Sequence, residues 1–145
     1  MFVKIRILGD CDGIGLYICN LSINLKWHLK KLENKTIGFA KSFSRPFPAV
    51  VVGAEFSYFK KTDKSKQIDS QILVRKLRDK LLTIGELYSK QNGNSVGCCA
   101  EVNCANQILI KRPFANLNNI KFSKAYRPRT MQVIPKCKNC KITFE

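Results

Sequence analysis

The sequence predicts an α/β domain in three layers, with a mixed β-sheet flanked by helices. Two apolar segments, 36–42 and 49–59, flank the proline-marked loop SRPFP, a spacing typical of a β-hairpin. Apolar residues with helical periodicity follow at 70–90. Cysteines stand where two later helices are expected to begin. The resulting order of elements, β-β-α-α-β, is that of a sheet covered by helices.

The first 35 residues form a predicted extension. Residues 2–8 and 15–21 have the short apolar character of strands, with the turn GDCDG between them, and leucines at helical spacing predict a helix over 23–33. A chain of 145 residues suits one domain. Because the later elements form a complete pattern by themselves, we interpret 1–35 as an appended β-β-α segment and 36–145 as the main domain.

The hairpin is followed by a predicted loop and by the clearest helix of the chain. The polar segment 60–66, KKTDKSK, is predicted to be the loop. Asp69 or Ser70 is expected to begin the helix, which spans about 70–90. One face of that helix carries the apolar residues Leu73, Leu77, Leu81, Ile84 and Tyr88.

The last third of the chain predicts a helix and two extended segments. The stretch GCCAEVNCANQIL, 97–109, begins a second helix that ends before Pro113, because proline interrupts helical hydrogen bonding. Residues 120–128 are predicted to form a strand, and 130–135 a short extended segment that leads into the final cysteines.

The charge balance indicates a polyanionic partner. Lys and Arg number 26 against 10 Asp and Glu, which gives a net charge of +16. Such a field attracts polyanions, of which nucleic acid is the commonest, although a membrane surface or a merely solvated basic face is also compatible with it. No run of 18 or more apolar residues is present, so we expect no membrane span.

The cysteines and the N-terminus bear on the compartment. Seven cysteines are an odd number and do not have the spacing of a disulfide framework. We therefore expect reduced thiols, some of them bound to metal, and action in a reducing, cytoplasm-like compartment. The apolar N-terminus is interrupted by Asp10 and Asp12, so we predict no signal peptide.

Cys137 and Cys140 form a C-x-x-C pair, a spacing that allows two thiolates to bind one tetrahedral metal ion. A redox pair has the same spacing. A structural zinc site needs two further ligands, whereas a catalytic site needs one and leaves a position for water. Cys99 is the candidate third ligand, and Glu101 is placed to move protons for that water if Cys99 lies outside the regular helix.

These residues carry a family resemblance. Cys99-Ala100-Glu101, with PKCKNC from Pro135 to Cys140, resembles the H/C-x-E…P-C-x-x-C signature of zinc-dependent nucleobase deaminases. The flanking sequences are most similar to the YwqJ-like branch of deaminase domains in bacterial polymorphic toxins. The similarity covers residues 36–145, but only about a dozen of these residues carry motifs that are specific to the family.

The resemblance implies a cytidine-deaminase-like fold, here abbreviated at its C-terminal end, with Zn²⁺ bound by Cys99, Cys137 and Cys140. It implies that Glu101 transfers protons while a base, cytosine in the first instance, is deaminated within DNA or RNA. It further implies a secreted or delivered toxin domain with an immunity protein as partner.

The chain also departs from the family pattern. Lys136 is inserted between Pro135 and Cys137, and Glu55 stands where an asparagine is expected. The substrate-binding residues are therefore unassigned, and the candidates to stack on a base are aromatic: Phe56, Tyr58, Phe114 and Tyr126. Two other functions fit the same residues, a non-catalytic zinc-stabilised module that binds nucleic acid and a deaminase of free nucleosides.

Overall fold

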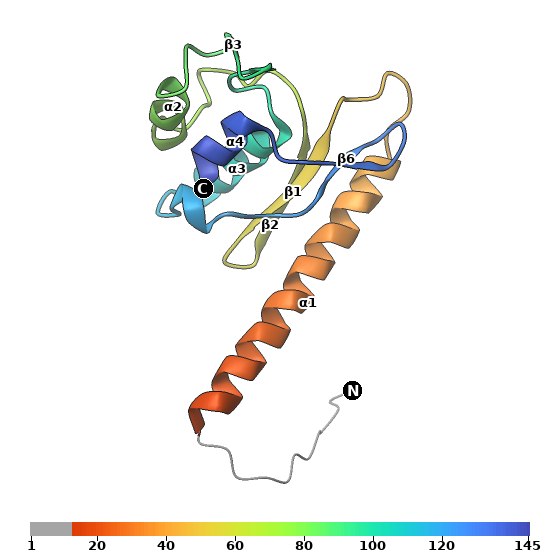
Figure 1. Ribbon diagram of the computed structural model, residues 1–145, viewed down its shortest axis with the longest axis vertical. Coiled ribbons are helices and arrows are strands. Elements are labelled where there is room, and N and C mark those ends of the chain that lie inside the picture. Colours follow the sequence, from red (N-terminus) through yellow and green to blue (C-terminus); the bar gives the residue numbers. More distant parts are fainter. Residues whose placement is uncertain (1–12) are drawn as a thin grey trace.

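The computed structural model describes residues 13–145, with side chains from residue 24 onward. Within that range the protein has four α-helices, a five-stranded sheet and a separate two-stranded hairpin. Helix α1 (Gly13–Lys41) covers one face of the sheet, and α3 (Ala100–Lys111) packs on the other face together with α4 (Lys138–Phe144) (Figure 1). The α/β class is confirmed. The strand pairs in this part of the chain are all antiparallel, so the expected mixed sheet is not observed.

Helix α1 replaces three predicted elements. The predicted strands 15–21 and 36–42 are wrong, and the predicted helix 23–33 is only the middle of a helix of 29 residues. The first strand, 2–8, lies outside the described residues. Leu32, Thr36 and Ala40 are fully buried at a spacing of four, and Thr36 satisfies its hydroxyl group by donating to the Leu32 carbonyl at 2.9 Å. Leu32 and Thr36 pack against Gly53 of the sheet, and this packing outweighs the β-propensity of residues 36–42.

The β-hairpin has a different second strand from the one predicted. Strand β1 (Val51–Phe56) pairs with β2 (Phe59–Lys64), which lies in the segment expected to be a loop. The turn between them has positive φ at Ser57 (45°) and Tyr58 (66°), a conformation that sequences normally mark with Asn-Gly. No such signal is present here. Strand β2 is an edge strand, and its lysines are typical of edges that must not pair with another chain.

The sheet has the order β2-β1-β6-β7, and β5 also pairs with β1. The predicted strand 120–128 is divided into β5 (Lys121–Phe122) and β6 (Ala125–Arg127). Ser123, between them, accepts a hydrogen bond from the Gly53 amide at 2.9 Å and interrupts the regular ladder. Strand β7 (Gln132–Ile134) confirms the predicted extended segment that leads to the last cysteines.

The predicted helix 70–90 is shorter than expected. Helix α2 spans only Arg75–Leu82, followed by an irregular segment and by the hairpin of β3 (Lys90–Gln91) and β4 (Asn94–Ser95). Leu73, Leu77 and Leu81 are buried as predicted. The predicted cap at Asp69 or Ser70 is wrong, because Asp69 accepts a bond from the Gln71 amide in a local turn before the helix.

Strand β1 is covered on both faces, and its residues alternate between them. Val52 and Ala54 pack in the main core with α3, while Gly53 faces α1. Helix α1 continues through position 35, so the boundary between the predicted extension and the main domain falls within it. That division of the chain stays a prediction. No helix among the described residues is long and apolar enough to cross a membrane.

The close approach of α1 to β1 depends on Gly53. A Cβ atom at this position would lie 2.2 Å from the Thr36 hydroxyl oxygen and 3.0 Å from a Leu32 methyl carbon. We therefore expect Gly53→Ala to lower the free energy of unfolding by about 1–3 kcal/mol, as overpacking in cores does. Gly38→Ala is the matched control. Gly38 lies in α1, and a Cβ atom added there would have nothing within 4 Å. Gly38→Ala is therefore expected to raise the free energy of unfolding by about 0.5–1 kcal/mol, because alanine favours a helix more than glycine does. Urea denaturation measures both, and equal effects would contradict the packing argument.

Candidate metal centre

Three cysteines meet at the starts of two helices. Cys99 is the residue immediately before α3, and Cys137 is the residue immediately before α4; both have extended backbone, with ψ of 149° and 162°. Cys140 lies in the first turn of α4. The three Sγ atoms all lie within 4.8 Å of one another, and those of Cys99 and Cys137 are 3.5 Å apart. The structure therefore brings together the three cysteines that the sequence predicts.

The spacing of the sulfur atoms fits a tetrahedral metal ion. Zinc–sulfur bonds of about 2.3 Å in tetrahedral geometry place the sulfurs about 3.8 Å apart, a value between the closest and the widest separations observed. Three soft thiolate ligands favour Zn²⁺ over Mg²⁺ or Ca²⁺. Within the described residues this is the one cluster of His, Cys, Asp and Glu side chains close enough to bind an ion.

The thiols have unequal acidities because they share hydrogen bonds. Hydrogen bonds from the Cys140 and Cys99 thiols hold the pKa of Cys137 well below its usual range, and the backbone amides of α4 act in the same direction. Donation to Cys137 raises the pKa of Cys99 to about 12, and it also raises the pKa of Cys140. Cys137 is therefore the most acidic of the three thiols, and a bound cation would favour the ionised form of all three.

Glu101 lies beside this cluster, in the first turn of α3. It is only 6% exposed, and this burial raises the pKa of its carboxyl group, while a backbone hydrogen bond opposes the shift. Because Cys99 precedes the helix in an extended conformation, the periodicity that separates positions two apart on a helix does not apply to the pair. Glu101 and Cys99 both line the same pocket.

The pocket that contains Glu101 has a volume of about 220 Å³. Its wall is built from the segment before β1, the β3–β4 hairpin and the end of β7; the polar lining residues besides the cysteines and Glu101 are Ser65, Asn94 and Ser95. Pocket volumes for drug-sized ligands are about 300–1,000 Å³. This pocket is smaller, so it suits a single planar group that enters from outside.

The aromatic residues predicted to stack on a base are elsewhere. Phe56 packs edge-on against Phe114 with ring centroids 5.8 Å apart, and Tyr126 donates a hydrogen bond to Glu33 of α1 at 2.6 Å. Tyr58 is in the turn of the β1–β2 hairpin. None of the residues lining the pocket beside the cysteines is aromatic. Glu55, which occupies the position of an expected asparagine, faces α1 and not the cysteines.

Sequence reasoning missed the role of Asn139, which lies between the two cysteines of the C-x-x-C pair. Its amide group donates to the carbonyls of Gln91 and Asn94 at 3.0 and 3.2 Å, and its oxygen accepts a bond from Asn92 at 2.9 Å. The start of α4 is thereby attached to the β3–β4 hairpin, which lines the pocket. The Asn-Gly pair at 92–93 has positive φ at both residues and was a recognisable sign of this hairpin.

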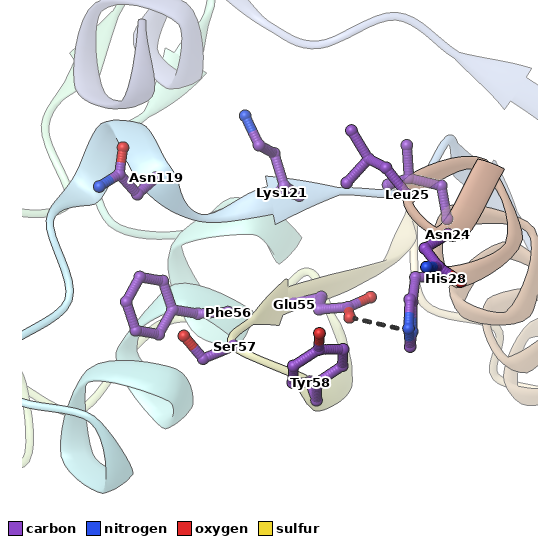
Figure 2. A pocket seen from close by; sticks show the side chains of 10 residues that line it. Asn24, Leu25, His28, Glu55, Phe56, Ser57, Tyr58, Asn119 and Lys121 are labelled. Carbon is purple, nitrogen blue, oxygen red and sulfur yellow. Dashed lines mark ion pairs between the residues drawn. The ribbon is translucent and has the colours of Figure 1, made fainter. Parts of the chain in front are cut away.

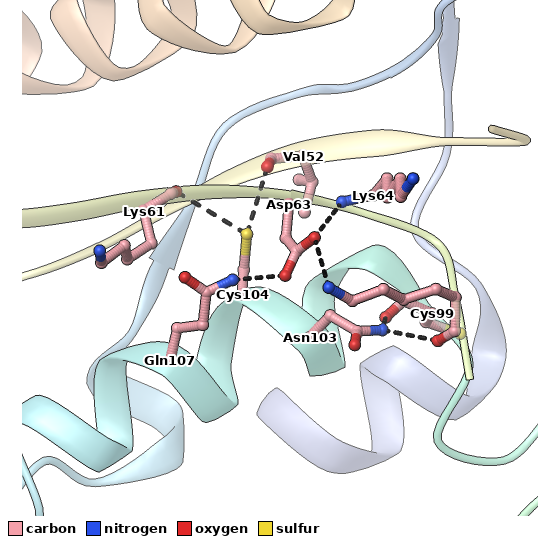
Figure 3. A network of polar contacts seen from close by, with 9 residues as sticks. Val52, Lys61, Asp63, Lys64, Cys99, Asn103, Cys104 and Gln107 are labelled. Carbon is pink, nitrogen blue, oxygen red and sulfur yellow. Dashed lines mark hydrogen bonds and ion pairs between the residues drawn. The ribbon is translucent and has the colours of Figure 1, made fainter. Parts of the chain in front are cut away.

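A second polar network supports the start of α3. Asn103 donates to the carbonyls of Cys99 and Lys66 at 3.0 and 2.8 Å, and Lys66 forms an ion pair with buried Asp63 at 3.2 Å (Figure 3). Gln107 also donates to Asp63. These contacts join β2 to α3 and hold the backbone of Cys99, so they help to orient a thiol of the candidate metal centre.

The remaining cysteines and lysines near the centre have other contacts. Cys104 packs as a small core residue, and its thiol donates to the Val52 carbonyl at 3.2 Å. Cys98 instead lines the pocket, and burial raises its pKa. Lys136, the inserted residue, forms an ion pair with Glu145 at 2.8 Å.

No protein family model, no curated protein and no solved structure matches this chain.

We expect Cys140→Ala to release about one equivalent of zinc per chain, because two thiolates alone do not complete the site. Unfolding of the variant should lose its dependence on added zinc, since stabilisation by a ligand requires binding to the native state. Elemental analysis and thermal melts measure these effects. Cys98→Ala is the control, since its thiol is adjacent in sequence but outside the cluster. Full zinc occupancy in a Cys99→Ala, Cys137→Ala double variant would refute the ligand assignment.

Proposed function

We propose that this protein is a zinc-dependent hydrolase that deaminates an amino-bearing base, cytosine in the first instance, within a nucleic acid. One observation carries the proposal: two thiols of the three-cysteine cluster, Cys99 and Cys137, line one pocket together with a buried carboxylate, Glu101. Three protein ligands leave one tetrahedral position open, which is typical of catalytic and not structural zinc. The similarity of the two motifs to the deaminase signature adds the reaction class.

The residues of the chain divide the chemistry among them. Cys99, Cys137 and Cys140 would hold Zn²⁺, which when bound lowers the pKa of a water molecule at its open position. Glu101 takes a proton from the attacking water as the new C–O bond forms at the amine-bearing carbon, and gives it to the adjacent ring nitrogen. It then passes the second proton to the amino group, the C–N bond breaks, and ammonia and a ring carbonyl are the products.

The size of the pocket supports a base as the group that enters it. A volume of about 220 Å³ favours one base over a complete nucleotide, so the sugar and phosphate stay outside. Arg45 and Arg129 line a hollow together with Phe47, and Phe47 is two residues from Ala49 in the pocket wall. Paired guanidinium groups are well suited to phosphate oxygens. We infer that they bind the backbone next to the inserted base.

The same motif similarity extends the proposal to biological role. A toxin domain delivered into the reducing compartment of another cell, with an immunity protein as its partner, is the context that the YwqJ-like resemblance supports.

Glu101→Ala tests the reaction. The carboxylate is not a ligand in this proposal, so zinc content and folding should stay nearly intact, while the rate of base conversion falls by roughly 10²–10⁴. Purified protein is incubated with defined DNA and RNA oligonucleotides, which are then sequenced for C-to-U and A-to-I changes. Glu86→Gln, an exposed carboxylate distant from the pocket residues, is the control. Unchanged conversion in a folded, zinc-replete Glu101→Ala protein would eliminate the mechanism and favour a non-catalytic zinc module.

Binding to single-stranded oligonucleotides should weaken steeply with salt, because bound lysines and arginines displace counterions. An Arg45→Ala, Arg129→Ala double variant should reduce the slope of log K against log salt by about 1.4, from roughly 0.7 for each phosphate contact. The control removes two exposed charges from α2, Arg75→Ala with Lys80→Ala, and should reduce the slope less. Equal slopes for the two variants would exclude the arginine hollow as a phosphate site.

A further inference from the structure

A second pocket lies between α1 and the end of the β1–β2 hairpin, on the face of β1 opposite α3. Its volume is about 270 Å³. Glu55 of β1 is at its centre, with His28 of α1 on one side and Tyr58 of the hairpin turn below; Lys121 of β5 is on the far wall (Figure 2). None of the residues lining it lines the cysteine pocket.

Glu55 has one carboxylate oxygen without a partner. The residue is 8% exposed, and its Oε1 atom forms an ion pair with Lys60 at 3.1 Å and lies 3.8 Å from His28 Nδ1. Its Oε2 atom is buried and has no hydrogen-bond donor among the described residues. A buried acceptor left unsatisfied is costly, and such groups in native proteins usually have a partner. A ligand that donates a hydrogen bond to Oε2 would supply it.

The charges around Glu55 indicate what kind of donor this is. Lys60, whose side chain is 14% exposed, already neutralises the carboxylate, and Lys121 lines the same pocket. A cationic ligand would be repelled by both lysines. The ligand is therefore a neutral N–H donor, and an attached anionic group would be attracted by Lys121.

Aromatic side chains border the same pocket and are available for stacking. Tyr58 is 75% exposed and lies edge-on to the His28 ring, with centroids 4.8 Å apart. Trp27, which is 58% exposed, does not line the pocket itself but packs edge-on against the same His28 ring at 5.2 Å. Exposed aromatics beside lysines are the elements from which proteins build stacking sites for nucleic acid bases.

We propose that this pocket binds an amino-bearing base of a nucleotide, with the exocyclic amine donating to Glu55 Oε2 and the ring stacked on Tyr58. Carboxylates accept hydrogen bonds from the cytosine amino group in the same manner. The site goes beyond the proposed deaminase activity and requires neither zinc nor Glu101. It would give the protein a second contact with a nucleic acid, on the opposite face of the sheet from the cysteines.

CMP and UMP are the probes, because they differ at the position that would face Glu55. CMP presents an amino group there, whereas UMP presents a carbonyl oxygen, and the N3–H donor of UMP is flanked by two carbonyls that a carboxylate repels. A hydrogen bond to a charged group favours CMP by about tenfold or more. Trp27 is the sole tryptophan of the chain and packs against His28, which lines this pocket, so its fluorescence is a probe placed beside the site.

The experiment titrates the full-length protein with each nucleotide and records Trp27 fluorescence, excited at the red edge where the bases do not absorb. We expect saturation with CMP and at least tenfold weaker binding of UMP. The titration is repeated with Glu101→Ala, in which CMP is not converted, and the same affinities are expected there. This repetition separates a failure of the second site from a failure of the deaminase proposal.

Two variants test the contacts. In Glu55→Gln the amide oxygen should stay next to the Lys60 ammonium group, because that group needs a hydrogen-bond acceptor. The amide N–H₂ group then takes the position of Oε2. The preference should then change from CMP to UMP. Tyr58→Asn should weaken the binding of both nucleotides about fivefold or more, because stacking is lost. Asparagine is chosen because it tolerates the positive φ of this position.

Glu86→Gln, an exposed substitution that likewise removes one carboxylate charge, should leave both affinities unchanged. The absence of saturation with either nucleotide at millimolar concentration would overturn the proposal. Equal binding of CMP and UMP by the wild-type protein would overturn it as well. If Glu55→Gln does not fold, Tyr58→Asn decides the question, and unaltered CMP binding in that variant would also reject the site.

Discussion

Strand β1 is buried on both faces, and the positions of both pockets depend on it. Helix α1 packs at Gly53, where no side chain intervenes, and α3 packs at Val52 and Ala54. Cys104 adds a thiol hydrogen bond to the Val52 carbonyl. The segment before β1 borders the cysteine pocket, and the last residues of β1 border the Glu55 pocket. A shift of α1 along this strand would therefore change one pocket directly and strain the packing that supports the other.

The cysteine cluster shows how a protein can bring three potential anions together before a cation binds. The other two thiols and the backbone amides at the start of α4 hold the pKa of Cys137 below its usual range. Hydrogen bonding to Cys137 raises the pKa of Cys99 and Cys140, and the three sulfur atoms all lie within 4.8 Å of one another, where like charges would repel. Helix N-termini favour anions, so α3 and α4 both contribute to the site through their direction. The backbone thus supplies part of the stabilisation that histidine ligands or neighbouring lysines would otherwise give.

The sequence is most informative where the chemistry is local. Helix α3, the C-x-x-C pair, Cys99 at a helix start and the buried stripe of α2 are all predictable, because each is marked by spacing within a few residues. The β1–β2 turn is not, since Ser57 and Tyr58 adopt positive φ without the glycine or asparagine that normally marks it. Residues 36–41 of helix α1 have the sequence character of a strand because Thr36 and Ile37 favour extended structure locally, and packing of the helix against β1 outweighs that preference. The partners of Asn139 and Glu55 come from distant segments and have no local signature.

The three hydrogen bonds of Asn139 have a consequence for the evolution of such a site. They connect the turn that carries Cys137 and Cys140, the candidate metal ligands, to the β3–β4 hairpin, which lines the pocket. Asn94 is exposed, lines the pocket and accepts from Asn139 through its backbone carbonyl, so a substitution of its side chain can alter the pocket rim without replacing any of the three cysteines. The pocket rim and the candidate metal ligands therefore belong to separate residues, which are joined by the Asn139 amide group. A lineage can diversify the first while it conserves the second.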